Sequence, residues 1–384
     1  MSDREKREIR IHNKSDKPDN IVMKEHKITQ DCDNIQKLLP KFLNGYFMYL
    51  KSNVLPMTRR AYLQDLNFFC NYLIKETDLT EAEIPGEIKS ADFEKIRAID
   101  INIYIDYLRC YNIEKDGTNI IYENDKKSLS RKKSSLSVLF KFLHRDGLIK
   151  DNITDGFDPI KLPKPSDREI KALQDDEVMK MLDAVTNGTD LTDKEYEYWK
   201  KTKFRDKAIL MLFLTYGLRI SELAQLNVSS FHFQRGEFKI YRKRGKESVM
   251  PLNNSVLSAL DDYISMEREN YLKLPEEDDA LFLSMQGKRI TERQIRELVK
   301  KYTSIGMQTS RKTGYSPHKL RATAATSLIG RGNSIYDVQA LMDHDNVTTT
   351  QLYAAHKMNV KRDLVKNFEW DEKYEFADKN RKEK

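Results

Sequence analysis

The chain has 384 residues, of which 39% are hydrophobic and 33% are charged, and its formal net charge is +7. A chain of this length is too long for one ordinary domain and apolar enough for packed cores, which excludes a disordered protein. The positive excess favours a polyanionic partner such as nucleic acid, although a well-solvated basic surface would explain the charge alone.

Cysteine usage and the first residues indicate the compartment. Cys32, Cys70 and Cys110 are odd in number and form no C-x-x-C pair, which disfavours a disulfide framework or a zinc site. The sequence begins without an apolar signal segment and has no run of about 18 apolar residues that could span a membrane. We therefore expect a cytoplasmic protein that associates with the nucleoid and not with membranes.

The amino-terminal part is predicted to be helical. Residues 1–30 lack a sustained hydrophobic period and are predicted to be a flexible arm. Residues 31–157 are predicted to form an all-helical domain, because apolar residues return at three- and four-residue steps. The expected helices contain Ile35–Tyr46, Thr58–Leu73 with Thr58 as the N-cap, Phe93–Leu108 and Leu129–Leu143.

The fourth expected helix begins with basic and hydroxyl residues. Arg131, Lys132 and Lys133 follow Ser128 and Ser130. Positive charge and unpaired backbone N–H groups at a helix start suit a phosphate backbone, while a solvated helix end is the alternative. We predict that the three basic residues bind DNA and that this domain clamps it.

A proline-rich linker separates the two expected domains. Residues 158–172 include Pro159, Pro163 and Pro165, which exclude a helix, and Lys164 is predicted to contact phosphates. Residues 173–384 are then predicted to form a mixed α/β domain that is mostly helical. Its small antiparallel sheet is expected from two short apolar runs joined by the basic turn Arg242–Lys246, namely Phe238–Tyr241 and Ser248–Leu252.

Three positions of the second domain have residue types that can bind a phosphate. Arg219 follows a glycine break and opens an apolar helix, where a guanidinium needs an anion, either a phosphate or the nearby Glu222. His318 and Arg321 are one helical turn apart after Pro317, so they share a face at a helix start.

Four further positions are weak signals in isolation. His344 follows the expected helix Ile335–Met342, where a surface histidine is the usual interpretation. Tyr353 is one of 19 tyrosines, most of which would be expected in the core. The turn lysines Lys243 and Lys246 would ordinarily be solvent-exposed.

In this order and spacing, the motifs closely resemble those of the tyrosine recombinase (integrase) family. The resemblance covers the whole second domain, and the helical first part suits the core-binding domain of that family. The matching stretches are T-x-G-L-R-x-S-E-L at Thr215–Leu223, the basic hairpin at Arg242–Leu252, P-H-x-L-R at Pro317–Arg321, the histidine box at Asp343–His344 and T-T-x-x-Y at Thr349–Tyr353.

The resemblance implies a role for each of the six positions. Arg219 and Arg321 would clasp the scissile phosphate, with His318 as proton acceptor or phosphate ligand. Lys243 would protonate the leaving 5′ oxygen, His344 would hydrogen-bond the phosphate and Tyr353 would attack it. A free tyrosine has a pKa of about 10, so this chemistry needs a base and a strongly cationic site but neither a metal ion nor another cofactor.

Several residues depart from the family pattern. Arg242 and Arg244 replace two glycines of the hairpin, and with Lys246 they are predicted to contact DNA. Asp343 replaces the glycine before His344 and would raise the pKa of that histidine. Ala322 stands where many members have histidine. None of these changes removes a catalytic position.

The overall length and the plain helical amino-terminal part are most similar to Xer-type recombinases, in the single-protein form that resolves chromosome dimers. An integrase of a phage or conjugative element is the main alternative, and a DNA-binding regulator without catalysis is the alternative of another class. A third alternative is a type IB topoisomerase. An apolar stripe between Val360 and Trp370 indicates a terminal helix, and the resemblance implies that it docks on the neighbouring protomer of a tetramer on two DNA sites; a helix folded back on its own domain is the alternative. A DNA translocase or accessory factor is a further possible partner.

Overall fold

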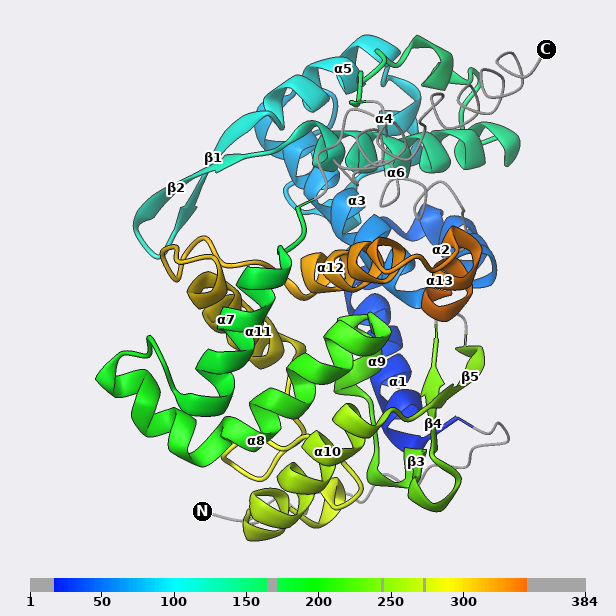
Figure 1. Cartoon of the computed structure of the whole chain (residues 1–384). Coiled ribbons are helices and arrows are strands. Elements are labelled where there is room, and N and C mark those ends of the chain that lie inside the picture. The colour runs from blue at the N-terminus through cyan, green and yellow to red at the C-terminus, as the bar shows by residue number, and fades with distance from the viewer. Residues whose placement is uncertain (1–16, 164–170, 243–244, 272–273, 344–384) are drawn as a thin grey trace, which may run out of the picture. The chain divides into compact units, whose positions relative to one another are not determined.

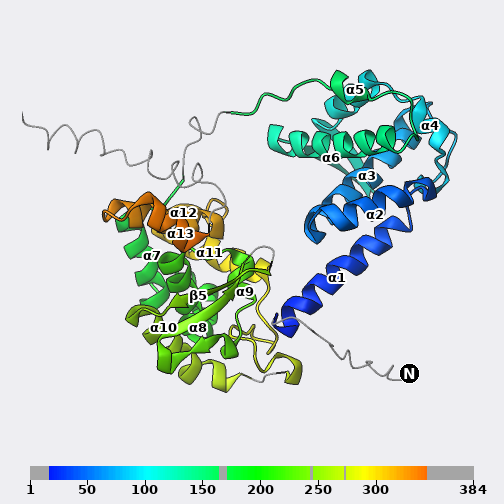
Figure 2. The same ribbon diagram turned by 90° about the vertical axis from the view of Figure 1, so that its right-hand side faces the viewer.

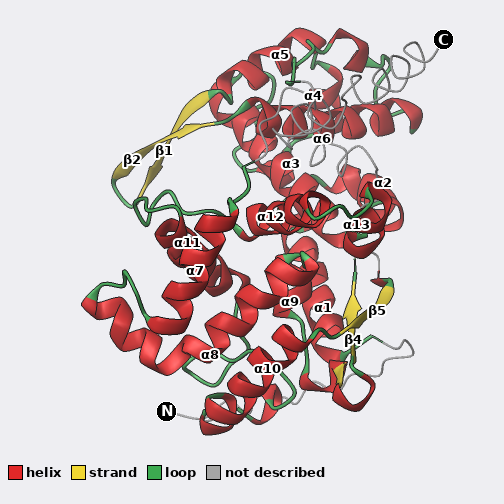
Figure 3. Cartoon of the chain, viewed as in Figure 1, coloured by secondary structure: helices red, strands yellow, loops and turns green. Residues whose placement is uncertain are grey.

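The computed structural model describes residues 17–163, 171–242, 245–271 and 274–343. The chain divides into two compact units, Met1–Lys164 and Pro165–Lys384. Helices dominate both units, and the strands of the described residues form two small antiparallel sheets (Figure 3). The prediction of a mainly α-helical fold with a small antiparallel sheet is confirmed.

The amino-terminal unit contains six α-helices and one β-hairpin within its described residues (Figure 1). In chain order they are α1 Asp19–Gln36, α2 Asn44–Asn53, α3 Pro56–Glu76, α4 Ser90–Glu94, α5 Ala98–Tyr107, β1 Cys110–Lys115, β2 Thr118–Glu123 and α6 Lys126–Arg145.

Helix α1 corrects the prediction of a flexible arm. It begins at Asp19, so residues 19–30 are helical, while residues 1–16 lie outside the described residues. Ile28 and Cys32 are buried on α1, and Arg59 of α3 donates a hydrogen bond to Asp33 at 2.8 Å. The contacts with α3 stabilise a helix whose own hydrophobic period is weak. Figure 2 shows that the amino-terminal end of α1 projects beyond the other helices of this unit.

Two other boundaries differ from the sequence predictions. Helix α3 begins at Pro56 with Leu55 as its N-cap, so the expected cap Thr58 lies inside the first turn. Proline at the first helical position has a φ angle that already suits a helix, and this explains the earlier start. The expected third helix is divided into α4 and α5.

The core of the amino-terminal unit is built from aromatic rings. Phe69 of α3 lies edge-on to Tyr104 of α5, with 4.9 Å between ring centroids. Its ring is also edge-on to Phe93 of α4 at 6.3 Å and to Phe140 of α6 at 6.4 Å. Edge-to-face contacts of this kind add to the stabilisation from burial, so Phe69 holds α4, α5 and α6 to α3.

The hairpin β1–β2 corrects the prediction of an all-helical first domain. Its strands pair antiparallel with Lys115 opposite Thr118, so Asp116 and Gly117 form a two-residue turn. Both turn residues have positive φ, 51° and 72°, which aspartate and glycine tolerate best. Tyr111 of β1 stacks on Tyr122 of β2 with ring centroids 5.5 Å apart.

The carboxy-terminal unit contains seven α-helices and a three-stranded sheet within its described residues. In chain order they are α7 Asp175–Asn187, α8 Asp193–Tyr216, α9 Ile220–Ala224, β3 Phe231–His232, β4 Glu237–Tyr241, β5 Glu247–Pro251, α10 Asn254–Met266, α11 Glu292–Gly306, α12 Pro317–Gly330 and α13 Ile335–Met342.

Helix α8 passes through the core of this unit and starts earlier than predicted. The sequence indicated a buried helix from Arg205, but α8 begins at Asp193 with Thr192 as its N-cap. Near the predicted start, the backbone N–H groups of Phe204 and Arg205 donate to the Glu267 carboxylate at 2.9 and 3.0 Å. Burial raises the pKa of Glu267 to about 7. Helix α8 nevertheless continues without a break from its more exposed first part into its buried second part.

The small sheet contains the two predicted strands, each within one residue of its expected bounds, and a third strand, β3. Strand β4 lies between β3 and β5, and Tyr241 faces Glu247 at the end of the hairpin. Phe238 and Ile240 of β4 are buried, and the alternation of buried and half-buried positions is that of a strand with one face on the core. Figures 1 and 2 both show α12 and α13 together at the end of the unit above α9 and β5.

The close contact of α7 and α11 depends on a glycine. A Cβ atom at Gly306 would lie 2.4 Å from the backbone oxygen of Glu177 and 3.1 Å from the Cβ of Met181. We expect Gly306→Ala to lower the free energy of unfolding by about 1–3 kcal/mol, because α7 must move away from α11. Gly330→Ala is the control, because nothing lies within 4 Å of that position. Urea denaturation that finds both variants equally stable would contradict this account.

Candidate active site

Arg219 is held at the junction between α8 and α9. Gly217 ends α8 with φ 55°, a left-handed conformation that favours glycine, and Arg219 is the N-cap residue of α9. Its Nη1 donates to Glu222 Oε1 at 2.8 Å, and Glu222 Oε2 accepts the Arg219 backbone N–H at 2.8 Å. The alternative partner Glu222 is therefore present, yet 31% of the arginine side chain remains exposed. That exposed part is available to a further anion.

His318 and Arg321 lie on one face at the start of α12, as predicted. Pro317 is at the first turn of this helix. Arg321 is only 2% exposed and donates hydrogen bonds to the backbone oxygens of Gly217 and Met342, the latter at 2.6 Å. These oxygens belong to the carboxyl ends of α8 and α13. Helix carboxyl ends carry partial negative charge, so both stabilise the buried guanidinium.

His318 lies close enough to both arginines to be affected by their charge. Its surface is exposed, but desolvation by the surrounding protein lowers the pKa of His318, and the positive charges of Arg321 and Arg219 lower it further. The ordinary pKa is 6.5, so the free protein has a mostly neutral imidazole at pH 7. A neutral imidazole can accept a proton or a hydrogen bond.

The depressed pKa can be measured in the free protein. We expect NMR titration of the His318 ring protons to give a pKa below 6.5. The Arg219→Gln variant should bring it closer to the ordinary value, since it removes one positive charge. Because the folded pKa is below the unfolded one, His318 costs no stability above 6.5 and becomes destabilising as pH falls through that value. An ordinary pKa in the wild-type protein would contradict the described geometry.

Arg242 is buried at the start of the basic turn, which corrects the prediction that it faces DNA. The residue is 5% exposed. Its Nη2 donates to the backbone oxygen of Leu341 at 2.7 Å and its Nη1 to that of Met342 at 3.0 Å. The guanidinium is thus used to join the end of β4 to the carboxyl end of α13.

Lys246, at the other end of the turn, binds Asp343. Its Nζ lies 2.7 Å from Asp343 Oδ1, and 67% of the lysine side chain is exposed. The hydrogen bond from Lys246 is the main cause that lowers the pKa of Asp343, with help from Arg242 and Arg219. Asp343 ends α13 with φ 51°, a left-handed conformation that aspartate tolerates better than most residues. The aspartate thus occupies a backbone position that favours glycine.

Three arginines therefore converge on the carboxyl end of α13. Arg242 binds the oxygens of Leu341 and Met342, Arg321 binds that of Met342, and Arg219 donates to the oxygen of Asp343 at 3.0 Å. The structure brings together four of the predicted site residues, Arg219, Arg242, Lys246 and Arg321, with His318 beside them. Five lie outside the described residues: Lys164, Lys243, Arg244, His344 and Tyr353.

The basic residues predicted to bind DNA in the amino-terminal unit are already engaged with protein groups. Arg131 and Lys132 both bind Asp65 of α3, with Arg131 Nη2 at 2.9 Å from Asp65 Oδ1. Lys133 donates to the backbone oxygens of Phe157 and Asp158. Arg131 still has 45% of its side chain exposed, so binding of a phosphate beside Asp65 stays a prediction.

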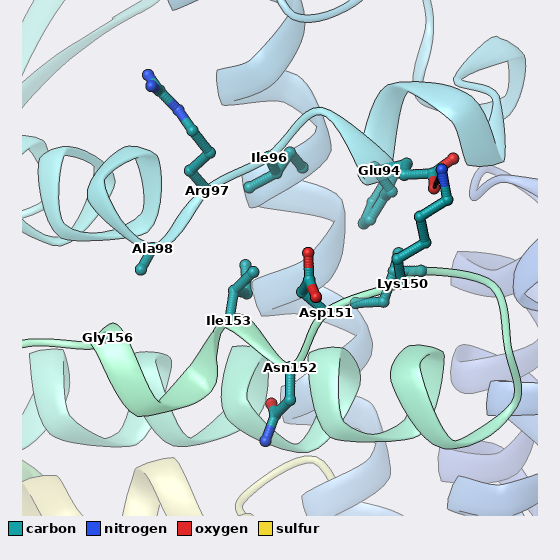
Figure 4. Close-up of a pocket in the computed structure, with 11 residues that line it drawn as sticks. Glu94, Ile96, Arg97, Ala98, Lys150, Asp151, Asn152, Ile153 and Gly156 are labelled. Carbon is teal, nitrogen blue, oxygen red and sulfur yellow. Dashed lines mark ion pairs between the residues drawn. The ribbon is translucent and has the colours of Figure 1, made fainter.

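A hollow of about 450 Å³ in the amino-terminal unit holds none of the predicted site residues (Figure 4). It lies between the α4–α5 connection and residues 149–156, with an ion pair of 3.4 Å from Lys150 to Glu94 at its rim. The described residues assigned to the scissile phosphate lie in the other unit, where His318 is exposed, Arg219 is half-buried and Arg321 is buried. This arrangement suits a large polymer better than a small enclosed ligand.

The described residues lack two further features. No group of three or more His, Cys, Asp or Glu side chains in them is arranged to hold a metal ion. None of their helices combines the length and the apolar character that a membrane span requires.

Sequence reasoning missed the backbone oxygens of the site. Gly217 O and Met342 O anchor Arg321, yet a carbonyl is present at every residue and has no sequence signal. Glu222, the alternative anion expected for Arg219, forms two hydrogen bonds with it. The contact of Lys246 with Asp343 has only a weak sequence signal, the opposite charges of a turn lysine and of an aspartate that replaces a glycine.

Comparison with known proteins extends this picture. Residues 171–359 match the Phage integrase family. The chain is 32% identical over 321 residues to the tyrosine recombinase XerC of Caldanaerobacter subterraneus subsp. tengcongensis, covering 82% of both chains. Its fold resembles that of the XerH site-specific recombinase bound to palindromic difH substrate, with a TM-score of 0.61, 16% identity and 89% coverage of both chains. The lambda integrase tetramer bound to a Holliday junction gives a TM-score of 0.54 at 15% identity, covering 88% of this chain and 81% of that one.

Proposed function

Because this chain belongs to the phage integrase family of tyrosine recombinases, enzymes that cleave and rejoin DNA, we propose that it recombines two copies of a specific double-stranded DNA site. The observation that carries the proposal is the convergence of Arg219 and Arg321 at the carboxyl end of α13, with His318 close enough to both to be affected by their charge. A scissile phosphate bound there would meet two guanidinium groups and a neutral imidazole.

The chemistry proceeds through a covalent protein–DNA intermediate. The Tyr353 oxygen attacks the scissile phosphorus, its phenolic proton passes to a base such as His318, and the bond from phosphorus to the 5′ oxygen breaks. Lys243 gives a proton to that 5′ oxygen. Arg219 and Arg321 stabilise the charge that grows on the phosphate oxygens. The tyrosyl phosphodiester keeps the bond energy, so the strands are rejoined by the reverse reaction without ATP.

The depressed pKa of His318 supports its role as the proton acceptor. A histidine beside two arginines stays neutral near pH 7 and has a free lone pair before DNA binds. His344 is assigned to hydrogen-bond the phosphate, by the resemblance of the Asp343–His344 box to the family pattern. In this proposal residues 158–172 form the linker between two domains. The first domain clamps DNA and the second cuts it.

We place this activity in the resolution of chromosome dimers, in a tetramer that holds two DNA sites. The similarity to XerC recombinases over most of the chain supports this choice over a mobile-element integrase. The protein would then act in the cytoplasm on the nucleoid, with a DNA translocase or another accessory factor as a further partner. Footprinting on the dimer-resolution site of the host chromosome tests this part, and protection of mobile-element ends instead would favour the alternative.

The covalent intermediate provides the direct test of catalysis. The preferred half-site is first selected from a randomised duplex library with the full-length protein. A duplex of that site is then prepared with a nick beside the cleavage position. Cleavage releases the short strand that carries the 5′ hydroxyl, and this strand dissociates, so the covalent complex cannot religate. We expect a denaturing gel to show a protein–DNA adduct that forms in EDTA and without ATP. Specific binding without any adduct would favour the catalytically inactive DNA-binding regulator.

A further inference from the structure

The basic turn between β4 and β5 is tied to α13 at both of its ends. Arg242, the first residue of the turn, binds the backbone oxygens of Leu341 and Met342. Lys246, the last, binds the carboxylate of Asp343. We call this set of contacts the turn clamp. The turn is also closed on itself, because the Arg242 N–H donates to the oxygen of Lys246 at 2.8 Å.

Two of the three residues that supply side chains to the turn clamp depart from the family pattern. Arg242 and Asp343 stand where the resemblance predicts glycines, and each of their side chains connects the turn with α13 or with its end. A glycine at either position would leave only backbone groups there and would remove one of the connections.

Arg242 is placed to hold the turn. It is 5% exposed, and its Nε is buried without a hydrogen-bond partner among the described residues. Its two Nη groups donate to backbone oxygens of α13, so the guanidinium connects the turn to that helix. The guanidinium fork, with donors in fixed directions, suits two neighbouring carbonyls.

We propose that Arg242 and Asp343 are positioning residues, which dock the turn on the carboxyl end of α13 and so orient the general acid that the turn supplies. The inference rests on the proposed function, because it assigns the proton donor for the 5′ oxygen to this turn. Arg242 precedes Lys243 in the chain, so its contacts fix the described start of the turn. Arg219 and Arg321 bind the same end of α13. The ends of the turn therefore lie beside the proposed phosphate site.

A sulfur substitution separates this role from a general structural one. In a DNA substrate whose bridging 5′ oxygen is replaced by sulfur, the leaving group is a thiolate. Thiols have pKa values near ~8.5, so the thiolate leaves without a proton from the enzyme. A variant that only misplaces the acid is therefore rescued by the sulfur substrate, and a variant that damages phosphate binding is not.

The test compares single-turnover cleavage of nicked oxygen and sulfur substrates. We expect Arg242→Gly to slow cleavage of the oxygen substrate by about 100-fold, the order of loss that a small misplacement of a catalytic group causes. On the sulfur substrate its rate should return to within about threefold of the wild-type rate, because the acid is no longer needed. Arg235→Gly, which removes an exposed arginine from the other turn of the same sheet, is the matched control and should behave as the wild type on both substrates.

A second variant keeps the test informative if Arg242→Gly does not fold. Asp343→Asn removes the charge that binds Lys246, while asparagine also tolerates the left-handed backbone. We expect it to slow oxygen cleavage by about tenfold and to be rescued by sulfur. Equal slowing on both substrates, or wild-type rates on both, would overturn the positioning role. Absence of any adduct from the wild-type protein on either substrate would overturn the proposed function and the positioning role with it.

Discussion

Replacing Tyr353 with phenylalanine is expected to abolish the covalent protein–DNA adduct while leaving binding to the selected site intact. The phenolic oxygen is the atom that forms the bond to phosphorus in the proposed reaction, and phenylalanine has no atom that can replace it. Loss of a nucleophile lowers the rate by at least about a thousandfold, since no other group of the site supplies its bond. The measurement is adduct formation on the nicked duplex, beside a gel-shift titration of the same DNA.

Tyr336→Phe is the matched control for this substitution. Tyr336 lies on α13 and is 70% exposed, so the loss of its hydroxyl should change neither binding nor cleavage. Mass spectrometry of the wild-type adduct should place the nucleotide on the peptide that contains Tyr353. An adduct of normal yield from Tyr353→Phe, or one that maps to another tyrosine, would show that the nucleophile has been assigned wrongly.

The sequence predicted the parts of the site that depend on local rules. Pro317 marks the start of α12 because its fixed φ suits the first helical position, and the three-residue spacing then places His318 and Arg321 on one face. The apolar run that ends at Met342 has the bounds of α13, Ile335–Met342. Gly217 ends α8 in the left-handed conformation that glycine favours. In each case one residue type has a strong backbone preference.

The predictions that failed depended on tertiary contacts or on a short turn. Helix α1 is stabilised by its contacts with α3, which a window of the sequence cannot show. The hairpin β1–β2 did have a local signal, since Asp116-Gly117 between alternating residues is typical of a two-residue turn. The burial of Arg242 could not be predicted, because an arginine in a basic turn is usually exposed. It is buried because two carbonyl oxygens at the end of α13, about a hundred residues away in sequence, need donors.

The two arginines assigned to the phosphate should respond differently to replacement by lysine. Arg321 bridges the carboxyl ends of α8 and α13 through Gly217 O and Met342 O. A single ammonium group cannot donate along both directions of the guanidinium fork, so Arg321→Lys leaves a buried carbonyl unpaired. We expect the free energy of unfolding to fall by about 1–3 kcal/mol. Cleavage should fall by about 100-fold or more, because the charge beside the phosphate is displaced.

Arg219→Lys should lower cleavage by a similar factor with much less effect on stability. Arg219 is partly exposed, and a lysine keeps the positive charge that pairs with Glu222, so the free energy of unfolding should change by less than about 1 kcal/mol. Single-turnover cleavage and urea denaturation of both variants measure the two effects separately. A loss of stability in Arg219→Lys but not in Arg321→Lys would contradict the assignment of the structural role to Arg321. The expected pattern would mean that Arg321 serves both the fold and the reaction, because the carbonyls that hold it are the ends of the two helices that frame the site.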